Sequence, residues 1–305
     1  MYLVCKKENA MSTSIAGMAL LSFLEAPKYA PSVRCKVLNS AGAEALGSDE
    51  RLSRTNVQLY DETFHEAITH WDSVRAYNYS VTYSLPDGIR GERILPKEML
   101  DSWWKYMEKA QARGIDIIND LAPTMPHLND RLRDRLQPIV YDQIKNKIPT
   151  EKDILRKWRI GFKGKPIADS SSIIFKWESD CVDRMKKQVE ENNKEILVHT
   201  HKAAYEKLYD VVSWFSDMTS QEKSSKIGMF EDKSLEKLRD IAELMPRMNV
   251  TGDAVLNEIA KATMDRLSGF TISDLKDDEE LRETKHDESM LIARAIQTVV
   301  GEVGS

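Results

Sequence analysis

Apolar residues recur at helical spacing along most of the chain after residue 95. Pro96 suits the first turn of a helix, and the apolar positions that follow are separated by four, four and three residues. The residues on this predicted face are Met99, Trp103, Met107 and Ala110. Gly114 is expected to interrupt the helix, and a second helix is expected over 115–121. A third is expected over 132–148 with a kink at Pro138, followed by a capped helix from Thr150 and an extended segment over 160–167.

The clearest pattern covers about residues 173–218. Its apolar positions alternate steps of three and four, which is typical of a coiled-coil seam and predicts one long coiled-coil-like helix. At about 1.5 Å per residue this helix would be roughly 60–65 Å long, so it extends from the body or lies along a bundle. The seam residues that we predict to contact a protein partner are Val182, Met185, Val189, Ile196, Leu208, Val211 and Phe215.

Three shorter amphipathic patterns follow the long one. They predict a helix that ends near Pro246, a helix over 254–267 that is capped by Thr251 to Asp253, and a last helix from about Asp277. Together with the long helix they predict a helical bundle with short loops.

The first 95 residues are of mixed character. Alternating apolar and polar positions predict strands over 33–38 and 76–85, the second of which would pair with 93–95. A short helix is expected over 59–71. Lys6 and Lys7 precede an apolar stretch over 15–24, which we interpret as a buried helix rather than a signal peptide, with Met11 as an alternative start.

These patterns predict a mostly α protein, α+β overall. The expected domains are a small N-terminal α+β region over 1–95 and a helical domain over 96–305 that is built on the long helix.

Composition narrows the class of protein. The chain has 305 residues, a net charge of −5, 41% apolar and 30% charged residues, and six Trp, which is the balance of a globular protein rather than a disordered one. No apolar run is long enough to predict a membrane-spanning helix. Three widely spaced Cys without a C-x-x-C pair favour a reducing compartment, and we expect a cytoplasmic protein.

No motif predicts catalysis or a cofactor. His65 and His70 are five residues apart, whereas the zinc-protease helix needs a spacing of four. His199 and His201 would diverge on a helix, and we interpret them as a surface pair rather than metal ligands. The sequence from Gly161 to Lys165 lacks the spacing of a phosphate-binding loop. We therefore expect no catalytic, cofactor or metal residues, with an enzyme of dispersed catalytic residues as an alternative.

A basic segment over 131–165 suggests an alternative function. It contains eleven basic against four acidic residues, a local charge of +7, with Trp158 and Phe162 among them. Basic residues interleaved with aromatic ones can contact phosphates and stack on bases, and a solvated helix face is the competing interpretation. The candidate nucleic-acid-binding residues are Arg156, Lys157, Trp158, Arg159, Lys163 and Lys165.

An acidic segment over 274–288 has the opposite charge. It contains eight acidic and three basic residues, a net charge of −5. We interpret it as acid that suits the N-terminus of the last helix, with binding to a basic surface as the alternative. If both charged segments bound a partner, copies of the chain would associate head to tail.

Trp103 and Trp104 are adjacent, so on a helix they cannot both face one core. We expect that one of them is exposed, or that both are wedged between two domains.

Two stretches of sequence resemble an uncharacterised phage and bacterial family of unknown function. The first is Ile148 to Asp169, which includes Trp158-Arg159-Ile160-Gly161-Phe162. The second is Leu244 to Asp253, which includes Met245-Pro246-Arg247-Met248-Asn249, together with Asp274 to Asp278 and Leu281-Arg282. The resemblance covers about residues 95–300 and carries over no catalytic residues, and the first 90 residues depart from it. Members of that family are often encoded beside MoxR-type AAA+ ATPases and von Willebrand A-type proteins.

The resemblance implies a phage origin and an accessory role beside an ATPase, in the host cytoplasm. Together with the long helix, it leads us to expect a non-enzymatic interaction protein. Its partner would be a protein, either an AAA+ ATPase or a second copy of the chain, and no membrane contact is expected. Nucleic-acid binding through residues 131–165 is the alternative.

Overall fold

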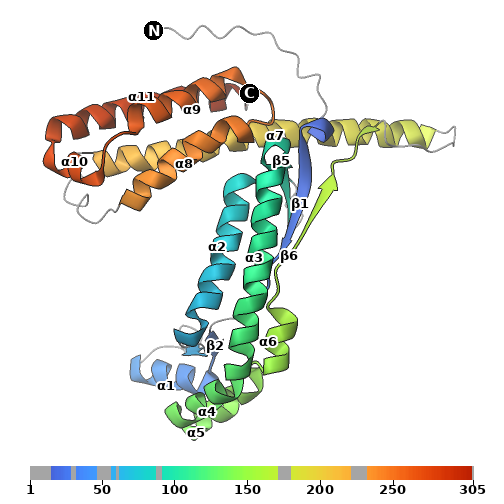
Figure 1. Ribbon diagram of the computed structural model, residues 1–305, viewed down its shortest axis with the longest axis vertical. Coiled ribbons are helices and arrows are strands. Elements are labelled where there is room, and N and C mark those ends of the chain that lie inside the picture. The colour runs from blue at the N-terminus through green and yellow to red at the C-terminus, as the bar shows by residue number, and fades with distance from the viewer. Residues whose placement is uncertain are drawn as a thin grey trace. The chain divides into compact units, whose positions relative to one another are not determined.

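The chain is mostly helical with a minor β region, as its patterning predicts (Figure 1). A computed structural model describes residues 15–28, 32–46, 56–59, 62–86, 91–170, 180–220 and 232–303. It divides the chain into two compact units. The bundle unit comprises Met1–Phe23, Tyr79–Asp101 and Gly164–Ser305, and the hairpin unit comprises Leu24–Asn78 and Ser102–Lys163.

This division differs from the single boundary that we expected near residue 95. Strand β1 (Ala19–Glu25) pairs antiparallel with β5 (Glu92–Pro96), so that Ala19 lies opposite Pro96 and Phe23 opposite Glu92. Residues from three separate stretches of chain therefore share one unit. Pairing between segments that are far apart in the sequence cannot be predicted from the local spacing of apolar residues.

Helices dominate the bundle unit. Its long helix α7 (Asp180–Thr219) packs along α11 (Glu279–Val303) and α8 (Asp232–Met248). Helix α9 (Ala254–Leu267) packs against α8 and α11, and the short α10 (Ile272–Asp277) precedes α11. The predicted long helix and bundle are thus present, while the expected helix start near 173 lies outside the described residues.

The sheet order is β4-β5-β1-β6, with β4 at Tyr83–Ser84 and β6 at Gly161–Pro166. The expected pairing of 83–84 with 93–94 is confirmed, but two other predictions were wrong. Residues 76–81 belong to helix α2 (His65–Val81) because Trp71, Val74 and Val81 are buried at helical spacing. The segment expected to be a buried helix over 15–24 is a 3-10 turn (Ile15–Gly17) followed by β1.

The hairpin unit is organised by α2 and α3 (Leu100–Leu121). His70 Nε2 lies 2.8 Å from the Ala110 carbonyl oxygen, and the Trp103 indole donates to Asn78 Oδ1 at 2.8 Å. Because a later residue of α2 meets an earlier residue of α3, the two helices run antiparallel. Helix α2 begins at His65, later than the predicted start at 59.

Smaller elements complete this unit. They are β2 (Ser32–Arg34), α1 (Lys36–Leu46), β3 (Asn56–Gln58), α4 (Met125–Arg135), α5 (Pro138–Ile144) and α6 (Glu151–Lys157). The strand predicted over 33–38 is limited to β2, which pairs with β3, and the helix α1 begins at Lys36. Pro138 begins α5 instead of kinking a longer helix, since the proline ring suits a first helical turn.

Gly114 does not interrupt α3, contrary to expectation. It is buried, and a Cβ atom at this position would lie 3.0 Å from Ile160 Cδ1 and 3.2 Å from Trp71 Cη2. The glycine therefore lets neighbouring side chains approach the helix backbone. Among the described residues, no helix is both long and apolar enough to cross a bilayer.

A candidate protein-binding groove

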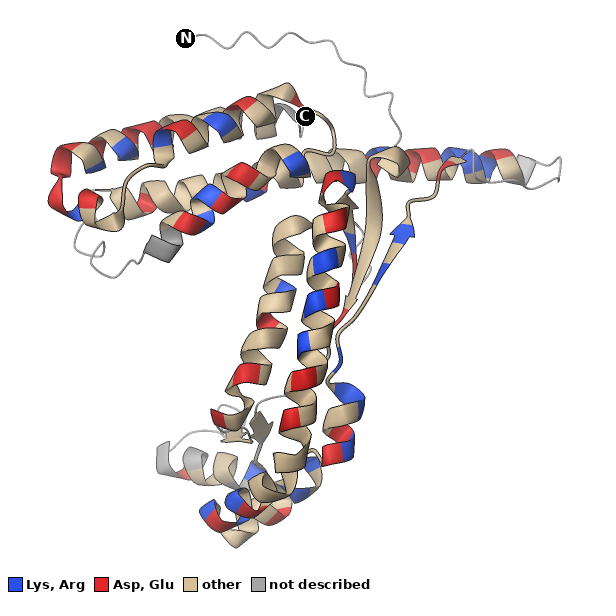
Figure 2. Cartoon of the chain, viewed as in Figure 1, with Lys and Arg blue, Asp and Glu red and all other residues tan. Residues whose placement is uncertain are grey.

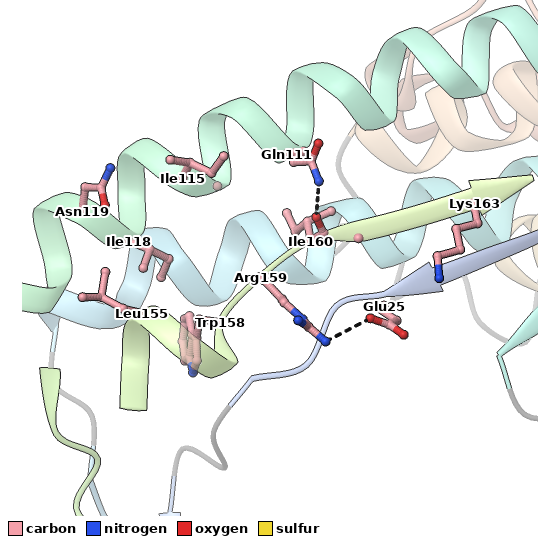
Figure 3. A pocket seen from close by; sticks show the side chains of 12 residues that line it. Glu25, Gln111, Ile115, Ile118, Asn119, Leu155, Trp158, Arg159, Ile160 and Lys163 are labelled. Atoms are coloured by element: carbon pink, nitrogen blue, oxygen red, sulfur yellow. Dashed lines mark hydrogen bonds and ion pairs between the residues drawn. The ribbon is translucent and has the colours of Figure 1, made fainter. Parts of the chain in front are cut away.

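A groove of about 550 Å³ lies in the hairpin unit, between α3, α6 and the segment that leads into β6 (Figure 3). We call it the α3–α6 groove. Gln111, Ile115, Ile118 and Asn119 line it from α3, and Leu155 and Trp158 line it from the α6 side. Ile160, Gly161, Arg159, Lys163, Gly114 and Glu25 complete the lining.

Large apolar side chains are exposed at this groove. Ile115 on α3 is 57% exposed and Leu155 on α6 is 47% exposed, whereas Ile118, Trp158 and Ile160 beside them are buried. Exposed apolar side chains that adjoin a hollow are typical of binding surfaces rather than of ordinary solvated faces.

Trp158 anchors the groove to the core of the unit. It is only 2% exposed, and its ring centroid lies 5.4 Å from that of Trp71 and 6.1 Å from that of Phe64. It is also the C-cap residue of α6, directly after Lys157. The end of α6 is therefore held by aromatic packing.

A capping box fixes the start of α6. The Asp153 backbone N–H donates to Thr150 Oγ1 at 3.3 Å, and the Thr150 backbone N–H donates to Asp153 Oδ2 at 3.1 Å. This confirms the cap predicted from the sequence. With both ends held, the short helix can present Leu155 in a defined position.

The polar edge of the groove is basic. Arg159 lies 3.4 Å from a carboxylate oxygen of Glu25, and Gln111 Nε2 donates to the Ile160 carbonyl oxygen at 2.7 Å (Figure 3). Lys163 has no ion-pair partner among the described residues. One cationic charge thus remains uncompensated beside the apolar wall.

The candidate nucleic-acid residues do not form one basic surface with an exposed aromatic ring. Trp158 is buried and cannot stack on a base, so this part of the prediction was wrong. Arg156 lies 3.4 Å from Asp153, Lys165 pairs with Glu92, and Lys157 is exposed. Acidic and basic residues alternate on α4 and α6, which differs from a continuous basic surface (Figure 2).

Phe162 is also engaged within the hairpin unit. Its ring centroid lies 5.6 Å from Trp103 and 5.2 Å from Trp104. Trp103 is fully buried and Trp104 is 39% exposed, so the two adjacent indoles do face different environments as predicted. Sequence alone did not indicate that Phe162 would pack against them.

The predicted interaction residues of the long helix fall into two groups. Leu208, Val211 and Phe215 are buried in the bundle unit, where α7 packs along α11 and α8, so they stabilise the fold and cannot meet a partner. Val182 is buried as well. Three residues are accessible to different degrees: Met185 is exposed, and Val189 and Ile196 are half-buried. The regular seam was mostly a signal of core packing.

A polar cluster in the bundle unit joins α7 to the start of α9. His201 Nε2 lies 2.8 Å from Asp253 Oδ2, Tyr205 donates to the same oxygen, and the Val255 N–H donates to Asp253 Oδ1 at 2.9 Å. Burial by itself raises the pKa of the Asp253 carboxyl, but the hydrogen bonds from His201, Tyr205 and Val255 lower it to about 2. His201 is therefore part of a helix-capping cluster rather than a surface pair with His199.

Lys207 is another partly buried charged group of the bundle unit. Its Nζ donates to the carbonyl oxygens of Tyr79, Ser80 and Thr82 at 2.9, 2.7 and 3.0 Å, where α2 ends. Burial, and then the nearby charge of Arg93, lower the pKa of Lys207 to about 7. A lysine that caps a helix C-terminus is a structural role, and no local sequence signal pointed to it.

Neither cluster is a metal site. Within the described residues, no three His, Cys, Asp or Glu side chains gather closely enough to hold a metal ion. His70, from the motif considered in the sequence, meets the Ala110 carbonyl oxygen.

The acidic segment lies on α10 and the start of α11 (Figure 2). Asp274 forms a capping box with Thr271, whose backbone and side-chain hydrogen bonds lower the Asp274 pKa. This agrees with the interpretation of acid at a helix start. Further along, Glu280, Asp287 and Leu291 are exposed.

No family model, curated protein or solved structure matches this chain. The resemblance to a phage and bacterial family therefore stays a prediction.

Proposed function

We propose that this chain is a non-enzymatic interaction protein that binds another protein in the α3–α6 groove. The observation that carries the proposal is the exposure of Ile115 and Leu155 on opposite walls of a hollow of about 550 Å³. Protein partners bind grooves of this kind with an apolar helix face, and polar residues at the rim set the orientation.

The charge of the rim adds a preference. Among the described residues, Lys163 is unpaired and Arg159 has one carboxylate neighbour, Glu25. An acidic partner surface would be attracted to this edge, whereas a basic one would be repelled. Following the sequence resemblance, the protein would be a phage-type accessory factor that acts beside an AAA+ ATPase in the host cytoplasm.

Site-specific photo-crosslinking tests this proposal. A benzophenone amino acid placed at Leu155 should form a discrete covalent adduct in the cell that encodes the chain, either with another protein or with a second copy of the chain. The matched control is position 139, because Ile139 is 59% exposed in the same unit but lies outside the groove. Absence of an adduct at 155, or the same adducts at both positions, would contradict the proposal.

Nucleic-acid binding remains the second candidate, because Arg156 and Arg159 have side chains that are 81% and 67% exposed. We propose to test it with a fluorescent single-stranded oligonucleotide at increasing salt. Binding that falls steeply with salt, and that weakens when Arg156, Arg159 and Lys163 are changed to Ala, would support it. Binding that is absent or insensitive to salt would end it.

A further inference from the structure

The solvent-exposed face of α11 has the apolar and acidic side chains that a ligand of the α3–α6 groove would need. Glu280, Asp287 and Leu291 are separated by seven and four residues, so they lie on one side of the helix. Leu291 is 58% exposed, while Ile292 and Ile296 bury the opposite side in the bundle unit. The exposed face thus combines one large apolar side chain with two carboxylates, and the exposed Arg294 lies beside Leu291 on the same face.

The groove has apolar walls and a basic edge, which complement this face of α11. Its walls expose Ile115 and Leu155, and its edge contains Lys163 without an ion-pair partner among the described residues. The charged residues that line the groove are Arg159 and Lys163 against Glu25, whereas Glu280 and Asp287 on α11 are both acidic. Opposite charges around an apolar contact are the usual basis for specific and correctly oriented docking.

We propose that the α3–α6 groove binds the exposed face of α11 from a second copy of this chain. The inference rests on the proposed function, since it names the partner of the same groove. Leu291 would enter the hollow between Ile115 and Leu155, and the carboxylates of Glu280 and Asp287 would face the edge with Lys163. This is recognition of a helix by a groove, with the apolar residue as the anchor.

The contact would be heterologous, because the groove and the helix face are different surfaces of one chain. Each copy could then offer its groove to one neighbour and its α11 to another, so association would proceed head to tail. An interface of this type has a property that can be tested. Two variants, each defective in a different surface, can still form one intact contact with each other.

The test uses the full chain in three variants. Leu155→Glu places a like charge in the groove, Leu291→Lys removes the anchor and places a cation on the helix face, and Ile139→Glu is the control for an exposed apolar residue elsewhere. All three positions are about half exposed or more, so the folds should be retained, as circular dichroism would verify. Sedimentation velocity and light scattering then measure association over a range of protein concentrations.

We expect the wild-type chain and the Ile139→Glu variant to form concentration-dependent oligomers. Each groove or helix variant alone should be monomeric, and their equimolar mixture should stop at a 1:1 dimer. Raising the salt from about 0.1 M to about 1 M shortens the Debye length from about 10 Å to about 3 Å, and should weaken wild-type association by about tenfold or more.

Several results would overturn the inference. They are a wild-type chain that stays monomeric, a Leu155→Glu or Leu291→Lys variant that associates like the wild type, and a mixture that forms no dimer. Crosslinking at position 155 shows whether such a result refutes only the second copy as the partner or also the proposed protein-binding function of the groove. A monomeric chain that still crosslinks to a different protein there refutes only the second copy as partner, whereas a monomeric chain without an adduct refutes both.

Discussion

Replacing Asp253 should loosen the junction between α7 and α9. In the folded chain one carboxylate oxygen caps α9 through the Val255 N–H at 2.9 Å, and the other accepts hydrogen bonds from His201 and Tyr205. The Asp253→Ala variant loses the cap, which costs about 1 kcal/mol. It also leaves the fully buried Tyr205 hydroxyl without this acceptor, which costs about 1–3 kcal/mol. We expect a total loss of about 2–4 kcal/mol in the free energy of unfolding.

The effect should depend on pH in a defined direction. Because the folded-state pKa of Asp253 is about 2, below its ordinary value of 3.8, the unfolded chain takes up the proton first as the pH falls. The stability contributed by the charge is complete above the ordinary pKa and is lost as the pH falls through about 2. It amounts to about 2 kcal/mol at most, and less where water screens the carboxylate. Asp253→Asn should keep the cap but lose this pH dependence.

Hydrogen exchange of the α7 and α9 amides, combined with urea unfolding followed by circular dichroism, measures both effects. Asp265→Ala is the matched control, since Asp265 is exposed on the same helix, and it should change the unfolding free energy by less than about 0.5 kcal/mol. The reasoning is refuted if Asp253→Ala destabilises α9 no more than this control does. It is also refuted if the wild type and the Asp253→Asn variant respond equally to acid.

Two other substitutions test the packing and electrostatics of single residues. Gly114→Val should destabilise the hairpin unit by about 1–3 kcal/mol, because even a Cβ would lie 3.0 Å from Ile160 Cδ1. The control Gly301→Ala should not destabilise the chain, because the space around Gly301 is open. Equal urea midpoints for the two variants would contradict this expectation. Lys207 has a folded-state pKa of about 7, below its ordinary 10.5, so between these values the unfolded chain binds more protons and stability should rise with pH. Lys207→Met should show a flatter pH profile in thermal unfolding, and a profile identical to that of the wild type would contradict the assignment.

Some features of the candidate site could be predicted from the sequence pattern, and others could not. The Thr150 cap and the short helix after it were predictable, because capping depends on residues three apart. Trp158 was predictable as an aromatic residue among basic ones, but not as a buried residue. Its burial depends on Phe64 and Trp71, which lie far away in the chain. The groove forms where α3 meets α6, so no local pattern could indicate that Ile115 and Leu155 line one hollow.

The sequence by itself determined the mostly helical class, the extent of the long helix as far as Met218, and the cap at Asp253. These features depend on periodicity and on hydrogen bonds between near neighbours. Only the tertiary structure decided that residues 15–24 include a strand, since β1 is stabilised by pairing with β5 some seventy residues later. It also decided which side of the α7 seam is core, because a periodic apolar face is the same in sequence whether it packs against α11 or against a partner.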